Sequence, residues 1–197
     1  MTKNNRTGFT MIEMVVTLGI VAALAAILTP IVSNYIDQAR NTRAGSEAQS
    51  IASAILAFNK DTGKWPIFQS GTNITVSSAT FNVLIGPGTN PTCSSCGATW
   101  LSANNGDLGN ILEQNSPSYG TTGKFAWRGP YITNIASDPW GNKYFVNGPG
   151  MAFGQSRAVF VLSAGPNATI DTIFSQNTGS GASAIVVGGD DIVARVK

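Results

Sequence analysis

The chain begins with an abrupt change from polar to apolar residues. Residues 1–8, MTKNNRTG, are polar and basic and contain no acid. From Phe9 the sequence is almost continuously apolar, and the 19 residues from Met14 to Val32 carry no charge. A helix rises about 1.5 Å per residue, and a hydrocarbon core about 30 Å thick needs about 20 helical residues. Residues 9–33 are therefore predicted to form a membrane-spanning helix.

After Pro30 the pattern becomes amphipathic, over residues 34–60. The apolar positions recur at steps of three and four residues: Tyr35, Ile36, Ala39, Ala44, Ala48, Ile51, Ala52, Ile55 and Phe58. This period predicts that the helix continues with an apolar stripe on one face. Because proline has no N–H, Pro30 should kink or loosen the helix one turn upstream. The helix from Phe9 to about Asn59 would be about 75 Å long, and Asp61-Thr62-Gly63 should end it.

The rest of the chain predicts a small head. Residues 61–124 are rich in Gly, Ser, Thr, Asn and Pro and are interpreted as a variable insertion, with a weak helix at about 107–114. Residues 125–197 are more regular. Their strand candidates, separated by glycine turns, are Lys143–Val146, Ala158–Ser163, Ala184–Val187 and Ile192–Val196. We expect an α+β fold in which a small antiparallel sheet packs on the second half of the long helix, like a ladle.

Composition and charge indicate an extracytoplasmic head. Charged residues make up only 11% of the chain, against about 25% in ordinary soluble domains. Lys3 and Arg6 are two of the 12 basic residues, so residues 9–197 carry ten basic and ten acidic residues. A neutral chain has no general attraction for nucleic acid, and no nucleic-acid partner is inferred. The two cations before the apolar run predict a cytoplasmic N-terminus by the positive-inside rule.

The absence of histidine narrows the chemistry. It excludes a Ser-His-Asp triad, a histidine general base and a histidine-ligated metal. Enzymes that use carboxylates or lysine are still allowed, but no two carboxylates have assignable acid and base roles. Asp138 beside Trp140 is the best candidate for a catalytic acid. Its segment, Asp138-Pro139-Trp140-Gly141-Asn142, is first of all a turn signal, because proline presets φ and glycine permits positive φ.

Glu13 does not fit an ordinary membrane anchor. An ionised side chain in a bilayer costs at least about 2.5–3.5 kcal/mol, so it normally has a partner. No cation lies within the apolar segment, and we expect the partner to come from elsewhere. A secretory signal peptide and a plain single-span anchor are the alternatives. The apolar run is longer than the roughly 7–15 residues of a signal core and no small-x-small cleavage site follows it, whereas a plain anchor leaves Glu13 unexplained.

The segment Gly8-Phe9-Thr10-Met11-Ile12-Glu13, followed by a long apolar run, resembles the prepilin signal of type IV pilins and type II secretion pseudopilins. The match covers about the first 35 residues. The resemblance implies that a prepilin peptidase cuts between Gly8 and Phe9 and removes residues 1–8. It also implies that the Phe9 amine is methylated, that the apolar helix is kept, and that Pro30 accompanies helix melting during assembly.

The physical logic of such a cleavage agrees with the position of the acid. Cutting after Gly8 would create a cationic Phe9 amine at the membrane face, and Glu13 of a neighbouring subunit can pair with it. In a low-dielectric helix bundle an unpaired carboxylate is costly, so this pairing would favour one axial register between subunits.

Cys93 and Cys96 are the only cysteines. Two cysteines without histidine cannot complete a tetrahedral zinc site within one chain, and no βαβ pattern supports a redox centre. In an oxidising compartment we prefer a local disulfide between them. It would close a very short loop and stabilise the head only modestly.

The C-terminal half resembles the major pseudopilins of type II secretion. The similar segments are Gly129-Pro130-Tyr131, residues 138–144, residues 162–167 and residues 189–192. That family holds a structural calcium ion in its last loop through carboxylates and main-chain carbonyls. The resemblance therefore implies a Ca²⁺ site formed by Leu162, Asn167, Asp190 and Asp191. Calcium takes six to eight oxygen ligands, which such a loop can gather.

The candidate calcium loop departs from the family. The stretch between Asn167 and Asp190 is longer than usual, Asn167 stands where Asp is typical, and Asp171 is an additional candidate ligand. The alternative is that these acids are solvated turn residues.

These features predict a structural subunit of a type IV filament-like polymer, either a type II secretion pseudopilus or a related type IV pilus, and not an enzyme. We expect a single-pass protein of the inner membrane that joins a periplasmic or extracellular filament. The expected partners are further copies, the prepilin peptidase, the inner-membrane assembly platform, minor pilins or pseudopilins, and membrane lipid before assembly. The alternatives are a membrane-anchored minor pilin or adhesin, and an exported enzyme with an uncleaved anchor.

Overall fold

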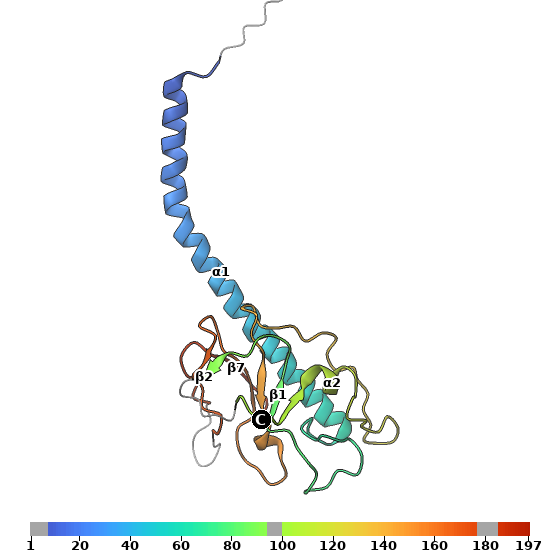
Figure 1. Ribbon diagram of the computed structural model, residues 1–197. Coiled ribbons are helices and arrows are strands. Elements are labelled where there is room, and N and C mark those ends of the chain that lie inside the picture. The colour runs from blue at the N-terminus through green and yellow to red at the C-terminus, as the bar shows by residue number, and fades with distance from the viewer. Residues whose placement is uncertain (1–7, 94–99, 177–184) are drawn as a thin grey trace, which may run out of the picture. The chain divides into compact units, whose positions relative to one another are not determined.

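The computed structural model describes residues 8–93, 100–176 and 185–197 (Figure 1). The chain divides into two compact units, Met1–Arg40 and Asn41–Lys197, each of which is considered by itself. One helix, α1 (Met11–Thr62), supplies residues to both units. The second unit, the head, contains all the strands.

In the first unit, α1 is apolar and exposed. By length and composition it can cross a membrane, and its most apolar window buries no residue. Pro30 lies inside α1. The hydroxyl of Thr29 donates to the carbonyl of Ala25 over 2.7 Å, and that of Ser33 donates to the carbonyl of Thr29 over 3.2 Å. The helix is assigned continuously through Pro30, and the kink expected there stays a prediction.

In the head, the remaining turns of α1 bury one face. The buried apolar positions follow the expected three- and four-residue steps: Ala44, Ala48, Ile51, Ala52, Ala54, Ile55 and Phe58. The helix ends at Thr62, and Gly63 follows with φ +66°, donating its N–H to the Asn59 carbonyl over 2.8 Å. The predicted glycine terminator is confirmed, because glycine adopts positive φ without a steric cost.

The head sheet has five strands in the order β3-β1-β4-β5-β7. They are β1 (Val83–Ile85), β3 (Asn105–Asp107), β4 (Phe145–Asn147), β5 (Phe160–Ser163) and β7 (Ile192–Arg195). The expectation of an antiparallel sheet was wrong in one respect, since β1 and β3 pair in parallel and the sheet is mixed. Residues 86–104 connect them, and a parallel pair needs a crossover of about a dozen residues or more.

Smaller elements complete the head. A second sheet pairs β2 (Thr92–Cys93) with β6 (Thr169–Ile170) in parallel. Helix α2 (Leu108–Leu112) confirms the weak helix expected near 107–114, and a 3-10 turn, η1, spans Pro149–Met151. Asp107 caps α2, with its Oδ1 accepting the Asn110 N–H over 2.8 Å.

The strand expected at Ala184–Val187 is not a strand at residues 185–187, and Ala184 lies outside the described residues. The backbone of Val186 is held by a side chain instead. The amide of Gln176 accepts from the Val186 N–H over 2.7 Å and donates to the Val186 carbonyl over 2.7 Å. These bonds occupy both groups that a sheet would use.

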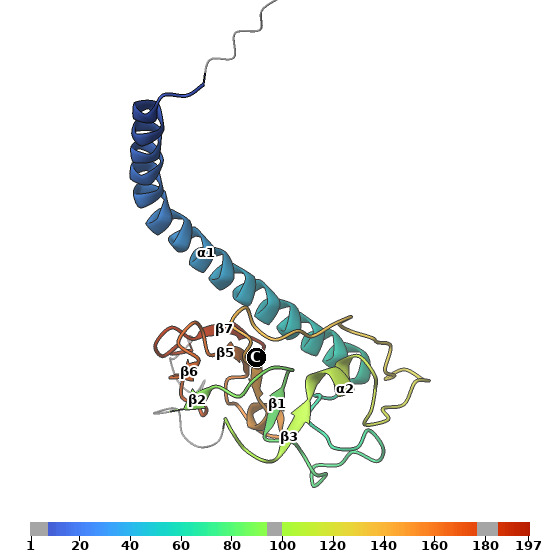
Figure 2. The same cartoon turned by 45° about the horizontal axis from the view of Figure 1, so that its top comes forward.

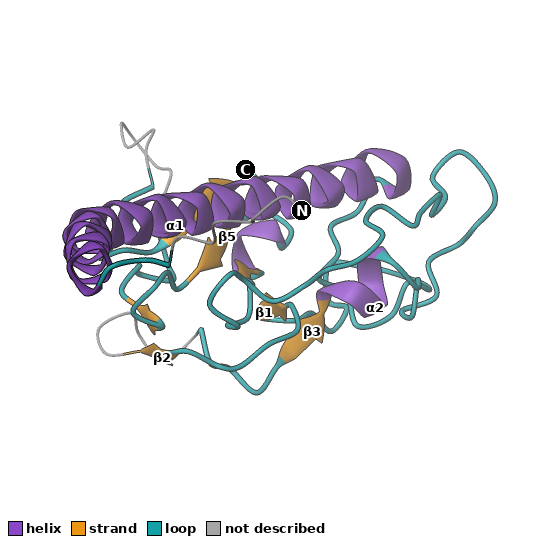
Figure 3. Ribbon diagram, turned by 90° about the horizontal axis from the view of Figure 1, so that it is seen from above, coloured by secondary structure: helices purple, strands orange, loops and turns teal. Residues whose placement is uncertain are grey.

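Two apolar clusters hold the head together, and residues 61–124 contribute to both. The first cluster packs α1 against the sheet and α2; from this region it takes Ile67, Phe68, Leu84, Leu108, Ile111 and Leu112. The second is centred on Trp100, whose ring lies edge-on to Phe145, Phe160 and Phe174 at 4.8–6.2 Å. Figures 2 and 3 show α2 and β3 beside β1 in the head. The stretch interpreted as an insertion is therefore part of the core.

Candidate functional site

The start of α1 holds the predicted processing and assembly residues. Gly8 and Phe9 precede the helix and are exposed, Phe9 by 82%, and a Cβ placed on Gly8 would touch nothing. The peptide bond between them is therefore not covered by any other described residue. The leader predicted for residues 1–8 lies outside the described residues except at Gly8.

Glu13 has a neutral partner within its own chain. Its Oε2 accepts from the Thr10 N–H over 3.1 Å and from the Thr10 hydroxyl over 3.0 Å, and its own N–H donates to Thr10 Oγ1 over 3.3 Å. This reciprocal arrangement is a capping box, and sequence reasoning missed it although Thr10-x-x-Glu13 is the typical pattern. It leaves the charge itself uncompensated, because the ion pairs of the described residues join only Asp37 to Arg40 and Arg43 to Glu47.

The apolar residues around Glu13 find no cover in this unit. The side chains exposed by about half or more are Met11, Ile12, Met14, Val15, Val16, Leu18, Ile20, Val21, Leu24, Ile27, Leu28 and Val32. They lie on every side of the helix, as expected for a helix surrounded by lipid or by other helices and not for one seated on a single core. Within the described part of this unit, these side chains need lipid or other helices to cover them.

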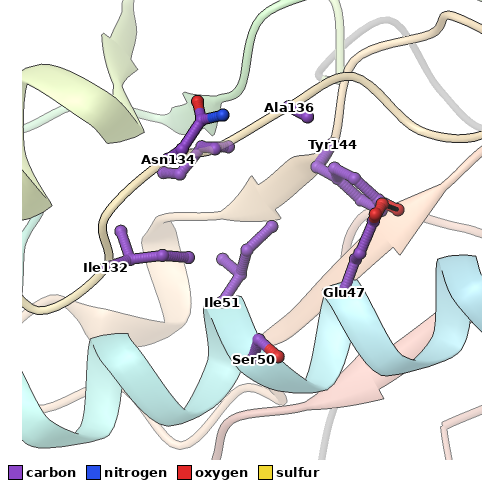
Figure 4. Close-up of a pocket in the computed structure, with 8 residues that line it drawn as sticks. Glu47, Ser50, Ile51, Ile132, Asn134, Ala136 and Tyr144 are labelled. Atoms are coloured by element: carbon purple, nitrogen blue, oxygen red, sulfur yellow. Dashed lines mark hydrogen bonds between the residues drawn. The ribbon is translucent and has the colours of Figure 1, made fainter.

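The head has a cavity of about 230 Å³ between α1 and residues 132–136 (Figure 4). Its apolar wall includes Ile51 and Ile132, and Glu47 and Tyr144 meet at one end. Tyr144 donates its hydroxyl to Glu47 Oε2 over 2.8 Å, while Glu47 Oε1 accepts from Arg43 over 2.7 Å. Burial, reinforced by the Glu47 carboxylate, raises the pKa of the Tyr144 phenol. The phenol is thus kept as a donor, and this lining offers no acid–base pair.

Asp138 is a turn residue, as its segment predicts. The side chain is only 3% exposed, and its Oδ1 accepts the N–H groups of Trp140 over 3.0 Å and Asn142 over 2.8 Å. Its Oδ2 accepts the Ser163 hydroxyl over 2.7 Å. Both oxygens are engaged and the carboxylate is shielded from solvent, so it is poorly placed to take a proton from a substrate.

Two of the candidate calcium ligands are brought together. The Asn167 N–H donates to Asp190 Oδ2 over 3.1 Å, which joins the loop after β5 to the loop before β7. Asp191 is 7% exposed, and its Oδ2 accepts from the N–H groups of Asp171 over 3.0 Å and Thr172 over 2.6 Å. Leu162 lies in β5, in register with Phe145 and Val193.

The residues of this acidic loop fit a cation. Oδ1 of Asp190 and Oδ1 of Asp191 are buried without a hydrogen-bond partner, and burial raises the pKa of Asp191. A bound cation would offset the burial of negative charge and would give a partner to an orphaned oxygen that faces it. Within the described ranges, no three Cys, Asp or Glu side chains are grouped closely enough to hold a metal. Calcium would therefore need main-chain oxygens as well.

Glycines make this loop possible, a feature that the search for acids missed. Gly165 and Gly189 have φ of +65° and +51°. A Cβ on Gly165 would collide with the Asp190 carbonyl, and a Cβ on Gly189 with the Asp171 carboxylate. At Gly165 only glycine allows the backbone to approach the Asp190 main chain so closely, and both positions use the positive φ that glycine adopts freely.

The disulfide is described at one end only. Cys93 is disulfide-bonded and lies in β2. Cys96, its expected partner, lies outside the described residues, so the pairing stays a prediction.

Family models match two separate parts of the chain. A family model described as prokaryotic N-terminal methylation motif matches residues 3–29, which include Gly8, Phe9 and Glu13. A second model, for protein G of the type II secretion system, matches residues 109–177, and so ends before Asp190.

Two relatives are similar over most of the chain. The type II secretion system core protein G of Pseudomonas aeruginosa is 27% identical over 150 residues, covering 76% of this chain and 79% of its own. The protein of the same name from Escherichia coli K12 is 23% identical over 165 residues, covering 84% and 85%. No solved structure gives a significant match.

Proposed function

We propose that this chain is a member of the family of type IV pilins and type II secretion pseudopilins, and that it is a structural subunit of the pseudopilus of type II protein secretion. One observation carries the proposal: residues 11–36 form a helix that is apolar on all sides, contains a single acid, and packs against nothing within its own unit. A helix of this kind is stable in lipid or in a bundle of similar helices.

The helix serves the two environments in succession. Before assembly it anchors the chain as a single span of the inner membrane, with the N-terminus on the cytoplasmic side. On assembly it leaves lipid for a bundle of identical helices, where the Phe9 amine of one copy, freed by cleavage after Gly8, pairs with Glu13 of another. Leaving lipid brings no hydrophobic gain, so packing and this charge pair must provide the attraction between helices.

The assembly is built on contacts that do not close. A subunit that offers one surface to the next subunit and a different surface to the previous one forms a helical filament, because the same rotation and translation relates each subunit to the next. The expected partners are further copies, the prepilin peptidase, the inner-membrane assembly platform and other pseudopilins. The relatives are core proteins of a secretion system by name.

The first experiment is to shear filaments from cells and identify the first residue of the polymerised chain by mass spectrometry. A methylated Phe9 at the start of the subunit is expected. Polymerised subunits that still carry residues 1–8, or a mature chain that starts well after Val32, would overturn the proposal, since either result removes the free amine next to the kept helix.

We also propose that the acidic loop binds one structural Ca²⁺. Asp190 and Asp191 would hold it, with Asn167, the Leu162 carbonyl and Asp171 as the further candidates. The ion would tie the loop after β5 to the loop before β7. The two buried orphan oxygens support this role. The midpoint of thermal unfolding should be higher in excess calcium than in chelator, and equal midpoints would argue against the site.

A further inference from the structure

The head carries a basic, aromatic surface where α1 ends. A cavity of about 230 Å³ opens there, with Lys64, Trp65, Phe153 and Lys197 among its lining. The Lys197 ammonium lies 5.9 Å from the centre of the Trp65 ring and donates to the carbonyls of Gly150 over 3.2 Å and Gln155 over 3.0 Å. Phe153 is 53% exposed. We call these four residues the distal surface.

More cations surround the distal surface. Lys60 lies in the last turn of α1, and Lys124 lies 5.5 Å over the ring of Phe125, which itself lies against Gly63. Asp61 is the one acid in residues 60–65. None of these lysines takes part in an ion pair within the described ranges. This end of the head therefore has a positive charge and exposed aromatic rings.

The opposite end of the head has the opposite character. Asp171 and Asp190 lie there beside three exposed apolar side chains, Ile173, Val186 and Val187, of which Val186 is 75% exposed. We call these five residues the proximal surface. If the proposed Ca²⁺ is bound, the three carboxylates of the loop still exceed its charge by one.

Helix α1 separates the two surfaces. The proximal surface directly precedes β7 in the sequence. Ile192 is the first residue of β7, and its side chain lies 3.9 Å from the position that a Cβ on Gly45 would take. Gly45 lies in the first turn of α1 that belongs to the head. The distal surface directly follows the last residue of the helix, Thr62. The 18 residues from Gly45 to Gly63 span about 27 Å along the helix axis.

We propose that the distal surface of one head receives the proximal surface of a second copy, and that this contact continues from head to head along the filament. The proposal rests on the proposed function. The lysines of the distal surface face the net negative charge of the acidic loop, and Ile173 and Val186 meet the rings of Trp65 and Phe153. Because the surfaces lie at opposite ends of one helix, a second head displaced along that helix brings them together. The contact is heterologous, and repeating it gives an open filament.

Cysteine cross-linking in assembled filaments tests this contact. A chain with Phe153→Cys and Ile173→Cys should give a ladder of covalent multimers when intact filaments are treated with a short thiol-reactive linker. Each single variant should give no ladder. A matched control, Phe153→Cys with Val76→Cys, places the second thiol at an 80% exposed valine outside both surfaces and should also give none.

A charge reversal separates recognition from mere proximity. Added to the double-cysteine chain, Lys64→Glu should cause loss of the ladder, whereas Lys143→Glu, the same change outside the distal surface, should leave it intact.

The outcomes distinguish the two proposals. Absence of filaments from the double-cysteine chain and from wild type counts against the proposed function. Filaments that form without a ladder overturn the head-to-head contact alone. Covalent dimers from Phe153→Cys by itself would also overturn it, because they would show like surfaces meeting across a two-fold axis.

Discussion

The two parts of α1 both carry apolar residues but have opposite surroundings. From Met11 to Ile36 the side chains are exposed, Met11 by 90%. From Ala44 to Phe58 one face is buried almost completely. In the second part the apolar residues form a stripe, and the head of the same chain covers it. In the first part they lie all around the helix, and no single head could cover them. A helix that is apolar on all sides must be completed by lipid or by other chains.

The largest expected effect comes from the only acid of the first part. Glu13→Leu should abolish filaments while leaving insertion intact, because it removes the charge that pairs subunits and also a cost of about 2.5–3.5 kcal/mol in the bilayer. Filaments sheared from cells and the membrane fraction would be measured side by side. Thr10→Ala is the matched control, since it removes the hydrogen bond from the Thr10 hydroxyl to Glu13 and keeps the carboxylate. Normal filaments from Glu13→Leu would contradict the proposed pairing of Glu13 with the Phe9 amine of another copy.

The second prediction concerns the core of the head. Trp100 is 1% exposed among three aromatic rings, and its indole donates to the Thr172 carbonyl over 2.9 Å. Trp100→Ala should lower the free energy of unfolding by about 3–5 kcal/mol. Urea unfolding of the detergent-solubilised chain, followed by circular dichroism, measures this. Val76→Ala, at an exposed site in the same stretch, should stay within about 0.5 kcal/mol. Equal effects would mean that residues 61–124 are not part of the core.

The third prediction concerns the calcium loop. Excess calcium should stabilise the wild-type head by about 2.7 kcal/mol when the ion is at a hundred times its dissociation constant. Asp191→Asn should remove most of that gain, because it takes away one charged ligand. Asp61→Asn, which removes an acid at the other end of the head, should retain it. Unfolding midpoints in calcium and in chelator, compared across the three chains, decide the matter. A calcium response that survives in Asp191→Asn would exclude Asp191 as a ligand.

Sequence patterns revealed the helix better than the head, for a physical reason. The apolar run, the steps from Ala44 to Phe58 and the stop at Gly63 depend on neighbours three or four residues apart. The strands β1 and β3 have three residues each and are separated by 19 residues, so no local period marks their pairing. Their burial depends on packing contributed by distant segments. The low apolar density of residues 61–124 therefore concealed their role in the core.

The candidate sites divide in the same way. Gly8, Phe9 and Glu13 lie within six residues of one another, so a motif could reveal them, and the capping box with Thr10 was visible in the same letters. The proximity of Asn167 to Asp190 depends on a loop closure across 23 residues. Gly165 and Gly189 permit the two loops to approach each other, but the spacing of these glycines in the sequence does not predict which acids they lie against.

The smallest expected effect lies at the polar contact that ties α1 to the head. Tyr144→Phe removes the hydroxyl that donates to Glu47 Oε2 over 2.8 Å. Bonds to charged groups contribute about 1.5–3 kcal/mol when buried. The Glu47 side chain is 30% exposed and keeps its bond to Arg43, so the loss should be smaller, about 1 kcal/mol. Urea unfolding of the variant against Tyr35→Phe, which changes an exposed tyrosine, measures it. A loss in free energy of unfolding as large as that of Trp100→Ala would show that a hydrogen bond, and not apolar packing, holds the helix to the head. The burial of apolar side chains would then not explain the contrast between the two parts of α1.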